Sequence, residues 1–388
     1  MPLSGKKVLF VVTEDWFFWM HRRNLALFLK EKGAEIYVAS RKGTYFNSIL
    51  NDGFHFTEFE ISRKSLNPFL RLRNIFHLKK ILNQVSPDIL HCVSIQPILI
   101  GAFASIGKKH LTVLAFTGLG YLFSENDLKR KTVRSLILSM LRYLFRLIHP
   151  VCIFENSDDE NEIRLKSGGT ADSYSTVPGS GVDLKLYSFV PEKPGGKRVL
   201  FSGRLLKEKG AELYAEAAAV LKKKNPEYEF LMAGPLDSEN RGAVSEKELK
   251  KWTLSGNVEW LGNVTDVAGL LKSINIVCLP TYYREGIPMA LIEASASGRS
   301  AVTTDTPGCR EIIKDGVNGI LIRPKDLGSL VSALEFLLEN PEIRAEHGRK
   351  GREIAEKFFS KETINSRVLS IYLDNMRSRY DKTDHSKN

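Results

Sequence analysis

The chain has 388 residues, of which 43% are hydrophobic and 26% are charged. This composition is typical of a globular protein long enough for two domains, and it excludes a disordered chain, a collagen-like repeat and a small disulfide scaffold. Residues 1–150 contain 22 Lys and Arg against 10 Asp and Glu, whereas the rest of the chain contains 34 against 35. The net charge of +11 therefore belongs to the first part, which we expect to meet an anionic surface, either nucleic acid or lipid.

Short apolar runs alternate with amphipathic patterns throughout the first half of the chain. Several runs are apolar on both faces, as the strands of a buried parallel sheet must be. The predicted strands are residues 7–12, 35–39, 88–93, 111–115 and 151–155. Helical spacing of apolar residues predicts helices over 21–32 and 68–82, and Gly33 is expected at the C′ position of the first helix.

A cluster of proline and glycine at residues 191–196 predicts a linker. The alternation then restarts, with predicted strands at residues 198–202, 228–233, 258–261, 274–279, 300–304 and 319–322. From residue 326 onwards the pattern is helical. Two successive βαβ series predict an α/β fold of two doubly wound, Rossmann-like domains, residues 1–190 and 197–360, which face each other across a cleft. Ligands bind at the carboxyl ends of the strands in such sheets, so the cleft is the expected site.

The four cysteines lie far apart and match no zinc-ligand spacing. Cys92, Cys152 and Cys278 fall in apolar runs and are expected to be reduced core residues. The first apolar run is too short for a signal peptide, and no uncharged stretch reaches the roughly 18–20 residues of a membrane span. These features predict a cytoplasmic protein that does not cross a membrane.

The segment from Leu279 to Ala294 combines a buried strand, a polar loop and a helix. Pro288 is expected at the first helical position, where backbone N–H groups and the helix dipole attract an anion. Glu285 lies in the loop, and Glu293 lies on an apolar stripe of the helix, where a carboxylate needs a partner such as a ribose diol. The alternative interpretation is a helix-capping Glu285 and a solvated Glu293.

A second polar segment follows the predicted strand at 198–202. The strand runs into Gly203, and Arg204 and Lys209 follow five residues apart. Arg can bind phosphate oxygens with two N–H groups, and Lys supplies a point charge. The alternative is a solvated, basic helix start, and the nearby Lys207 leaves the choice of lysine open.

These motifs together resemble the family 4 retaining glycosyltransferases of the GT-B fold. The matching positions are Gly203-Arg204, Lys209-Gly210, Gly262, Pro280, Glu285-Gly286, Pro288, Glu293-Ala294, Pro307-Gly308, Glu311, Gly316, Asn318 and Gly319. The resemblance covers nearly the whole chain and is densest over residues 198–323. It also implies that the last helix, within residues 361–388, crosses back onto the first domain.

The resemblance implies a role for each residue of the donor site. Arg204 and Lys209 would bind the donor diphosphate, and Glu293 would hold the nucleotide ribose. Glu285 would contact the donor sugar, and Arg204, Lys209 and Glu285 are the expected catalytic residues. Further donor-binding positions are Gly234, Gly286, Ile287 and Pro288.

The first half resembles a narrower group of bacterial enzymes that add N-acetylhexosamine-type sugars to polyprenyl-diphosphate-linked saccharides. The matching segments are residues 13–17, His21-Arg22, 62–69 and 117–120. Many relatives have His-Gly where this chain has Thr117-Gly118, so the role of that histidine is not carried over. The residues expected on the acceptor side are Glu14, Asp15, His21 and Thr117.

Two basic amphipathic segments explain the charge of the first part. Their cations include Arg71, Arg73, Lys79, Lys80, Arg142 and Arg146. Helices of this kind lie on anionic bilayers, so we expect the protein at the inner face of the cytoplasmic membrane. The alternative is an ordinary helix with a wet basic face. No nucleic-acid-binding module is evident, and no nucleic acid partner is expected.

The charges predict how transfer would proceed. A sugar leaving a nucleoside diphosphate, for which the resemblance favours uridine, builds negative charge on phosphate that Arg204, Lys209 and the helix start would neutralise. The resemblance implies retention of anomeric configuration without a protein nucleophile. No Asp-x-Asp motif is evident, and Asp158 to Glu160 resemble a solvated helix start, so we expect neither a metal nor a cofactor beyond the nucleotide-sugar substrate.

Two other functions fit the same architecture. One is a nucleotide-sugar epimerase, which would convert its donor without an acceptor. The other is an inactive scaffold that binds a sugar nucleotide. A nicotinamide dehydrogenase is excluded because Gly118 and Gly120 are not followed by the third glycine of the dinucleotide motif.

Overall fold

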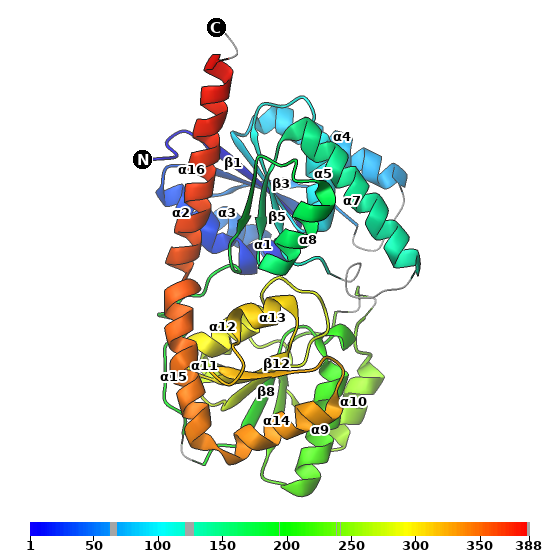
Figure 1. The fold of residues 1–388 in the computed structure, drawn as a ribbon, viewed down its shortest axis with the longest axis vertical. Helices are drawn as coiled ribbons and strands as arrows, with labels where there is room; N and C mark the ends of the chain where they lie inside the picture. Colours follow the sequence, from blue (N-terminus) through cyan, green and yellow to red (C-terminus); the bar gives the residue numbers. More distant parts are fainter. Residues whose placement is uncertain (63–67, 121–127, 194, 238, 241, 386–388) are drawn as a thin grey trace. The chain divides into compact units, whose positions relative to one another are not determined.

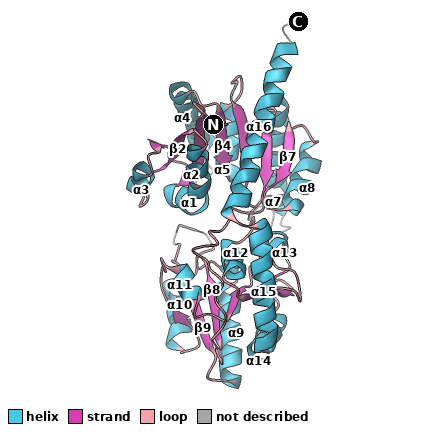
Figure 2. Cartoon of the chain, turned by 90° about the vertical axis from the view of Figure 1, so that its left-hand side faces the viewer, coloured by secondary structure: helices cyan, strands magenta, loops and turns pink. Residues whose placement is uncertain are grey.

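The computed structural model describes residues 1–388 except 63–67, 121–127, 194, 238, 241 and 386–388. The chain divides into two compact units, one formed by Met1–Ser180 with Lys361–Asn388 and the other by Gly181–Ser360. Each unit has a parallel β-sheet with helices packed on both faces (Figures 1 and 2). The predicted pair of doubly wound α/β domains is confirmed.

The first unit contains seven parallel strands in the order β3-β2-β1-β4-β5-β6-β7. Its strands are β1 (Lys7–Glu14), β2 (Glu35–Arg41), β3 (His55–Glu58), β4 (Ile89–Val93), β5 (Leu111–Phe116), β6 (Val151–Phe154) and β7 (Ser173–Thr176). Its helices are α1 (Asp15–His21), α2 (Arg23–Glu31), α3 (Phe46–Asn51), α4 (Pro68–Val85), α5 (Ile95–Ala104), α7 (Leu128–Ile148), α8 (Ser157–Ser167) and α16 (Lys361–His385). The prediction found the five inner strands and missed β3 and β7, because these edge strands are short and partly polar.

The second unit contains six parallel strands in the order β10-β9-β8-β11-β12-β13. Its strands are β8 (Arg198–Ser202), β9 (Glu229–Ala233), β10 (Glu259–Trp260), β11 (Ile276–Leu279), β12 (Ser300–Thr304) and β13 (Gly319–Ile322). Its helices are η1 (Lys207–Lys209), α9 (Ala211–Lys224), α10 (Glu246–Leu254), α11 (Val267–Leu271), α12 (Met289–Ala296), α13 (Pro307–Ile312), α14 (Leu327–Glu339) and α15 (Pro341–Phe358). All six predicted strands are present.

Burial on both faces of each sheet explains the continuous apolar runs. In β8, Val199 and Phe201 belong to one hydrophobic cluster and Leu200 to the cluster on the opposite face. In β1, Phe10 packs in the cluster that also contains Val368 of α16, and α16 lies beside α2 (Figure 1). The last helix is therefore part of the first unit's core.

The predicted helix over residues 21–32 is interrupted in the structure. The chain forms α1 and α2, which meet at Arg22. The Arg22 guanidinium donates to Glu155 Oε1 at 3.2 Å and to Ser180 Oγ at 2.9 Å. These distant partners explain why local spacing did not reveal the break. Gly33 directly follows the C-cap of α2 with φ +96°, as predicted.

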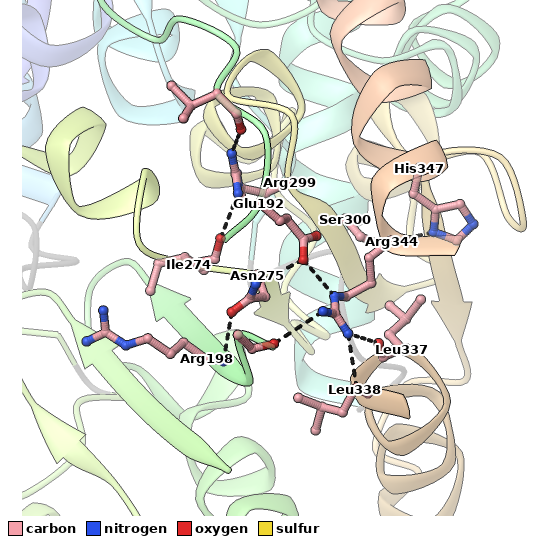
Figure 3. Close-up of polar contacts among 12 residues, drawn as sticks. Glu192, Arg198, Ile274, Asn275, Arg299, Ser300, Leu337, Leu338, Arg344 and His347 are labelled. Atoms are coloured by element: carbon pink, nitrogen blue, oxygen red, sulfur yellow. Dashed lines mark hydrogen bonds and ion pairs between the residues drawn. The ribbon is translucent and has the colours of Figure 1, made fainter. Parts of the chain in front are cut away.

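The segment predicted as a linker is anchored to the second unit. The first unit ends at Ser180 rather than at residue 190. Glu192 Oε2 accepts hydrogen bonds from Asn275 Nδ2 at 2.9 Å and from Arg344 Nε at 3.0 Å (Figure 3). Arg344 is 2% exposed, so this ion pair is buried.

A second buried arginine holds the same segment. Arg299 donates from its guanidinium to the Val190 carbonyl and, at 3.0 Å, to the Ile274 carbonyl (Figure 3). The Val190 carbonyl and the Glu192 carboxylate, on either side of Pro191, are therefore both bound to the second unit. The position of this segment therefore depends on side chains far away in sequence.

The structure also shows whether Asp159 and the cysteines are buried and whether a described helix could span a membrane. Asp159 was expected to be solvated, but it is fully buried and its backbone N–H donates to Asn156 Oδ1, the N-cap of α8. All four cysteines are buried and form no disulfide. Within the part of the chain that the structure describes, no helix is long and apolar enough to cross a bilayer.

Candidate functional site

The strand order of the second sheet reverses between β8 and β11. These two central strands pair in parallel, and the chain proceeds to β9 on one side and to β12 on the other. Ligands bind at such a switch point, at the carboxyl ends of the strands. Arg204 and Lys209 follow β8, and Glu285 follows β11, so the fold brings these predicted residues to that edge.

Lys209 and Glu285 form an ion pair at this edge. Lys209 Nζ donates to Glu285 Oε2 at 2.9 Å, and the two side chains are 14% and 15% exposed. Thr281 donates its hydroxyl to the other oxygen of Glu285 at 3.2 Å. The structure also separates the two candidate lysines, since Lys207 instead pairs with Glu248.

Glycine allows the β8 and β11 loops to approach each other. Gly210 follows Lys209 with φ +80°, and a Cβ atom at this position would lie 2.2 Å from the Pro280 carbonyl oxygen. No larger residue fits without moving the loop. The Lys209–Glu285 pair therefore depends on the glycine that the sequence motif contains.

Arg204 has a carboxylate partner that the sequence analysis missed. Its Nη1 atom lies 2.6 Å from Asp237 Oδ2, and the side chains are 30% and 12% exposed. Asp237 follows β9, the strand next to β8, and its place after a predicted strand was the signal available in the sequence. Gly234, predicted to bind the donor, lets the two strand ends approach, because its Cβ would lie 1.9 Å from the Gly203 carbonyl oxygen.

The loop before α12 differs in one detail from the prediction. Pro288 is the N-cap of α12 rather than its first helical residue, and its carbonyl accepts from the Leu291 N–H at 3.0 Å. The helix has no side-chain cap, so the alternative of a capping Glu285 is wrong. Gly286 and Ile287 are buried, and a Cβ on Gly308 of α13 would lie 1.4 Å from the Gly286 carbonyl oxygen.

Glu293 lies on α12, is half-buried and has a tyrosine hydroxyl as a partner. Tyr187 donates its hydroxyl to Glu293 Oε1 at 2.9 Å. Burial raises the pKa of Glu293 to about 7, against the smaller opposite effect of the Tyr187 hydrogen bond. Glu293 is therefore not a fully solvated side chain, because it is half-buried and bound to Tyr187. Tyr187 was missed because it lies in the segment that the sequence assigned to the first domain.

The residues predicted for the acceptor side lie at the carboxyl edge of the first sheet. Asp15 is buried, and its Oδ2 atom accepts from the backbone N–H groups of Gly43 at 2.8 Å and Tyr45 at 2.9 Å. Glu14 is buried and lies 3.7 Å from Arg41 Nη1. In this structure Asp15 therefore binds the loop that contains Gly43 and Tyr45, and the Glu14 carboxylate lies near the Arg41 guanidinium.

Thr117 and His21 have polar or aromatic neighbours at the same edge. Thr117 Oγ1 lies 3.0 Å from Ser94 Oγ, and Ser94 has φ +74° directly after β4. A serine in this backbone region is strained, and strain of this kind often accompanies a functional site. The His21 ring contacts that of Phe17. Most of the predicted motif at 62–69 lies outside the described residues.

A pocket opens in the first unit between the sheet and α16. Its polar lining consists of His21, Arg22, His91, Glu155, Ser180 and Asn365. Burial and the charge of Arg22 keep the pKa of His91 well below its usual value, and Tyr372 contacts the Nδ1 atom of this ring. Neutral His91 and the Arg22–Glu155 ion pair give the pocket hydrogen-bonding groups without a large net charge.

The basic residues of the first unit lie on two helices that cover one face of its sheet. Leu78 of α4 and Leu141 of α7 belong to the same hydrophobic cluster, and both helices contact α5 (Figure 1). Arg73, Lys80, Arg142 and Arg146 are exposed, whereas Arg71 and Lys79 are half-buried. Exposed apolar side chains lie among these cations on both helices: Phe69, Leu72, Phe76, Val133, Leu136, Tyr143 and Leu147.

Among the described residues, no group of three or more His, Cys, Asp or Glu lies close enough together to hold a metal ion. The charged groups at the second sheet's edge include the two cation–carboxylate pairs Arg204–Asp237 and Lys209–Glu285.

Two family models match the two units in order. Residues 7–153 match the glycosyl transferase 4-like model, and residues 186–354 match the model of glycosyl transferases group 1. The chain is 28% identical over 358 residues to the N,N'-diacetylbacillosaminyl-diphospho-undecaprenol alpha-1,3-N-acetylgalactosaminyltransferase of Campylobacter jejuni, covering 89% of this chain and 92% of the relative. It is 26% identical to the putative glycosyltransferase EpsD of Bacillus subtilis, covering 95% of this chain and 97% of the relative.

Solved structures agree with this assignment at the level of the fold. Anabaena Alr3699/HepE in complex with UDP and glucose matches with a TM-score of 0.75 and 17% identity, covering 94% of this chain and 98% of the other. Sucrose-phosphate synthase from Thermosynechococcus elongatus matches with a TM-score of 0.77 and 16% identity, covering 96% of this chain and 100% of the other. The chain belongs to the glycosyltransferases of the GT-B fold, with a glycosyl transferase 4-like domain followed by a group 1 domain.

Proposed function

We propose that the protein transfers an N-acetylhexosamine or related sugar from a uridine diphosphate donor to a polyprenyl-diphosphate-linked saccharide in bacterial surface glycan synthesis. The observation that carries this proposal is that Arg204, Lys209 and Glu285 follow the two central strands at the switch point of the second sheet, where Lys209 pairs with Glu285. Two cations there match the charge of a diphosphate, and a carboxylate beside them matches sugar hydroxyls.

Each part of the substrate has a counterpart among the residues. Arg204 and Lys209 neutralise the charge that develops on the departing diphosphate, and Glu293 accepts hydrogen bonds from the ribose. The acceptor oxygen attacks the anomeric carbon from the face that the diphosphate leaves, so configuration is retained. The acceptor's proton passes to a departing phosphate oxygen, and the scheme uses neither a protein nucleophile nor a metal ion.

The relatives support the choice of substrate class. The Campylobacter jejuni relative is named for an N-acetylgalactosamine transfer to a diphospho-undecaprenol saccharide. A Staphylococcus aureus relative, 21% identical over 378 residues, is named for capsular polysaccharide biosynthesis. The HepE structure, which has the same fold, holds UDP and glucose.

The test is a transfer assay combined with a binding screen. We expect UDP to raise the melting temperature more than other nucleoside diphosphates do. We also expect a UDP-N-acetylhexosamine to lose its sugar to a polyprenyl-diphosphate saccharide. Conversion of the donor without acceptor would identify an epimerase instead, and UDP binding without any transfer would indicate the inactive scaffold. Failure to bind any nucleoside diphosphate would overturn the proposal.

We also propose that α4 and α7 place the first unit on an anionic bilayer, at the inner face of the cytoplasmic membrane. The described residues of the two helices contain Lys and Arg but neither Asp nor Glu, and they expose apolar side chains among these cations. Phe69 and Phe76 of α4 are 78% and 68% exposed. A basic helix with exposed phenylalanines is suited to anionic headgroups, at about 1 kcal/mol per cation near the surface.

Charge reversal tests this membrane surface. Changing Arg71, Arg73, Lys79 and Lys80 to Glu is expected to abolish co-sedimentation with vesicles that contain anionic lipid. A matched control reverses four lysines on helices of the second unit, Lys223, Lys247, Lys250 and Lys251, and should sediment like the wild type. Equal sedimentation of both variants and the wild type would remove the membrane proposal.

A further inference from the structure

Both cations proposed to bind the donor diphosphate already have a carboxylate partner in the protein. Lys209 pairs with Glu285, and Arg204 pairs with Asp237. The proposed function gives a role to only one of these two acids. Glu285 is expected to bind the donor sugar, whereas Asp237 has no role in that proposal, although it lies beside the arginine expected to bind phosphate.

The Arg204–Asp237 pair is built into the fold rather than formed by chance on the surface. Asp237 is only 12% exposed, and the distance of 2.6 Å between Nη1 and Oδ2 is that of a charge-assisted hydrogen bond. The two residues follow neighbouring strands, whose ends are brought together by the Gly203–Gly234 contact. The close approach of the two strand ends brings the loops that carry the carboxylate and the guanidinium together.

A diphosphate that reaches Arg204 meets this carboxylate as well. Phosphate oxygens and Asp237 carry the same charge and require the same N–H donors of the guanidinium. Like charges a few ångströms apart repel strongly in a partly buried site. Asp237 therefore opposes the binding of the nucleoside diphosphate that Arg204 favours.

We propose that Asp237 competes with the diphosphate for Arg204, holding the arginine in place in the empty site and promoting release of the nucleoside diphosphate product. This inference rests on the proposed function, because it assigns a diphosphate to Arg204. It makes Asp237 a positioning residue. Removing the Asp237 charge should strengthen UDP binding if Asp237 competes with the diphosphate. It should weaken UDP binding if Asp237 only holds Arg204 in position.

The experiment measures UDP affinity by titration calorimetry for the wild type, Asp237→Asn and Asp237→Glu. Asparagine keeps an oxygen for the Arg204 hydrogen bond but removes the charge. We expect Asp237→Asn to bind UDP about tenfold more tightly, with stronger product inhibition by UDP during transfer. We expect Asp237→Glu to stay near the wild-type affinity, and uridine, which lacks phosphate, to bind all three proteins equally.

Glu229→Gln is the matched control. Glu229 pairs with Arg198 at 3.0 Å across the same two strands, β8 and β9, but at their amino ends. Its removal should leave UDP affinity unchanged. Asp237→Ala is a second variant for the case in which the asparagine protein does not fold, and it should also bind UDP more tightly.

The outcomes separate this inference from the proposed function. If the wild type binds UDP while the folded Asp237→Asn and Asp237→Ala proteins bind it equally or more weakly, the competition is disproved and the proposed function stands. If the wild type binds no nucleoside diphosphate, the proposed function fails and the competition fails with it.

Discussion

Replacing Arg204 by alanine is expected to lower kcat/KM for sugar transfer at least about a hundredfold, because one charge-stabilising donor in an active site commonly contributes about 3–4 kcal/mol to the barrier. The structure adds a second cause. Asp237 is 12% exposed, and without the Arg204 guanidinium beside it this carboxylate would repel the incoming diphosphate more strongly. Initial rates with the UDP-sugar and a polyprenyl-diphosphate acceptor measure the effect.

The control for this variant is Arg198→Ala, which removes an arginine from the opposite end of the same strand. Arg198 is about as exposed as Arg204, at 32% against 30%, and it also forms an ion pair with a carboxylate, that of Glu229. We expect its activity within about twofold of the wild type, because exposed pairs contribute little. Near-wild-type turnover in a folded Arg204→Ala protein would show that the second sheet's edge is not the donor site.

Replacing Glu293 by glutamine is expected to stabilise the protein at pH 8 while weakening UDP binding at least about tenfold. Burial raises the pKa of Glu293 from 4.5 to about 7, so the folded state holds this proton more tightly than the unfolded state does. The stability of the wild type therefore falls as the pH rises from about 4.5 to about 7, and the loss is complete above that range. Glutamine is neutral at every pH and avoids the loss.

The size of this effect follows from the difference between the folded and unfolded pKa values of Glu293. A tenfold difference in proton affinity corresponds to about 1.4 kcal/mol, so the loss of stability between pH 5 and pH 8 is on the order of 2 kcal/mol. Thermal melts of both proteins at the two pH values measure it, with Glu353→Gln, an exposed glutamate of α15, as control. A Glu293→Gln protein that melts below the wild type at pH 8 would contradict the cost assigned to the buried charge.

UDP binding by the same variant tests the other half of the prediction. A charged carboxylate accepts hydrogen bonds from ribose hydroxyls more strongly than a neutral amide does. If Glu293→Gln binds UDP more weakly and is more stable than the wild type, the Glu293 carboxylate strengthens UDP binding and lowers the stability of the folded protein. Unchanged UDP affinity would remove Glu293 from the donor site.

The sheets were predictable because their central strands are buried on both faces. Val199, Leu200 and Phe201 are all fully buried, two of them on one side of β8 and one on the other, so the sequence shows a continuous apolar run. The edge strands β3 and β7 were missed because an edge strand keeps exposed, polar positions.

The motif positions of the proposed donor site could also be predicted, since glycines and charges that follow buried strands are typical of a ligand site in a parallel sheet. Gly210 and Gly234 are required by close backbone approaches, and the residues beside them follow strands that pair in the sheet. Parallel strands place their carboxyl ends at one edge, so strand prediction alone indicated that Arg204, Lys209 and Glu285 would meet.

The local sequence could not reveal which side chain pairs with which. Arg22, where the predicted helix breaks, binds Glu155, 133 residues away, and the 191–196 segment is held by Arg344 and Arg299. Lys209 and Lys207 look alike in the sequence, but Glu285 binds the first and Glu248 the second.

Periodicity and end signals act over a few residues, so they determined the strands, the two-sheet architecture and the motif positions. The partners of Arg204 and Glu293, which are Asp237 and Tyr187, were decided only by tertiary structure. An ion pair or a hydrogen bond depends on distance in space, and it leaves no local pattern in the chain.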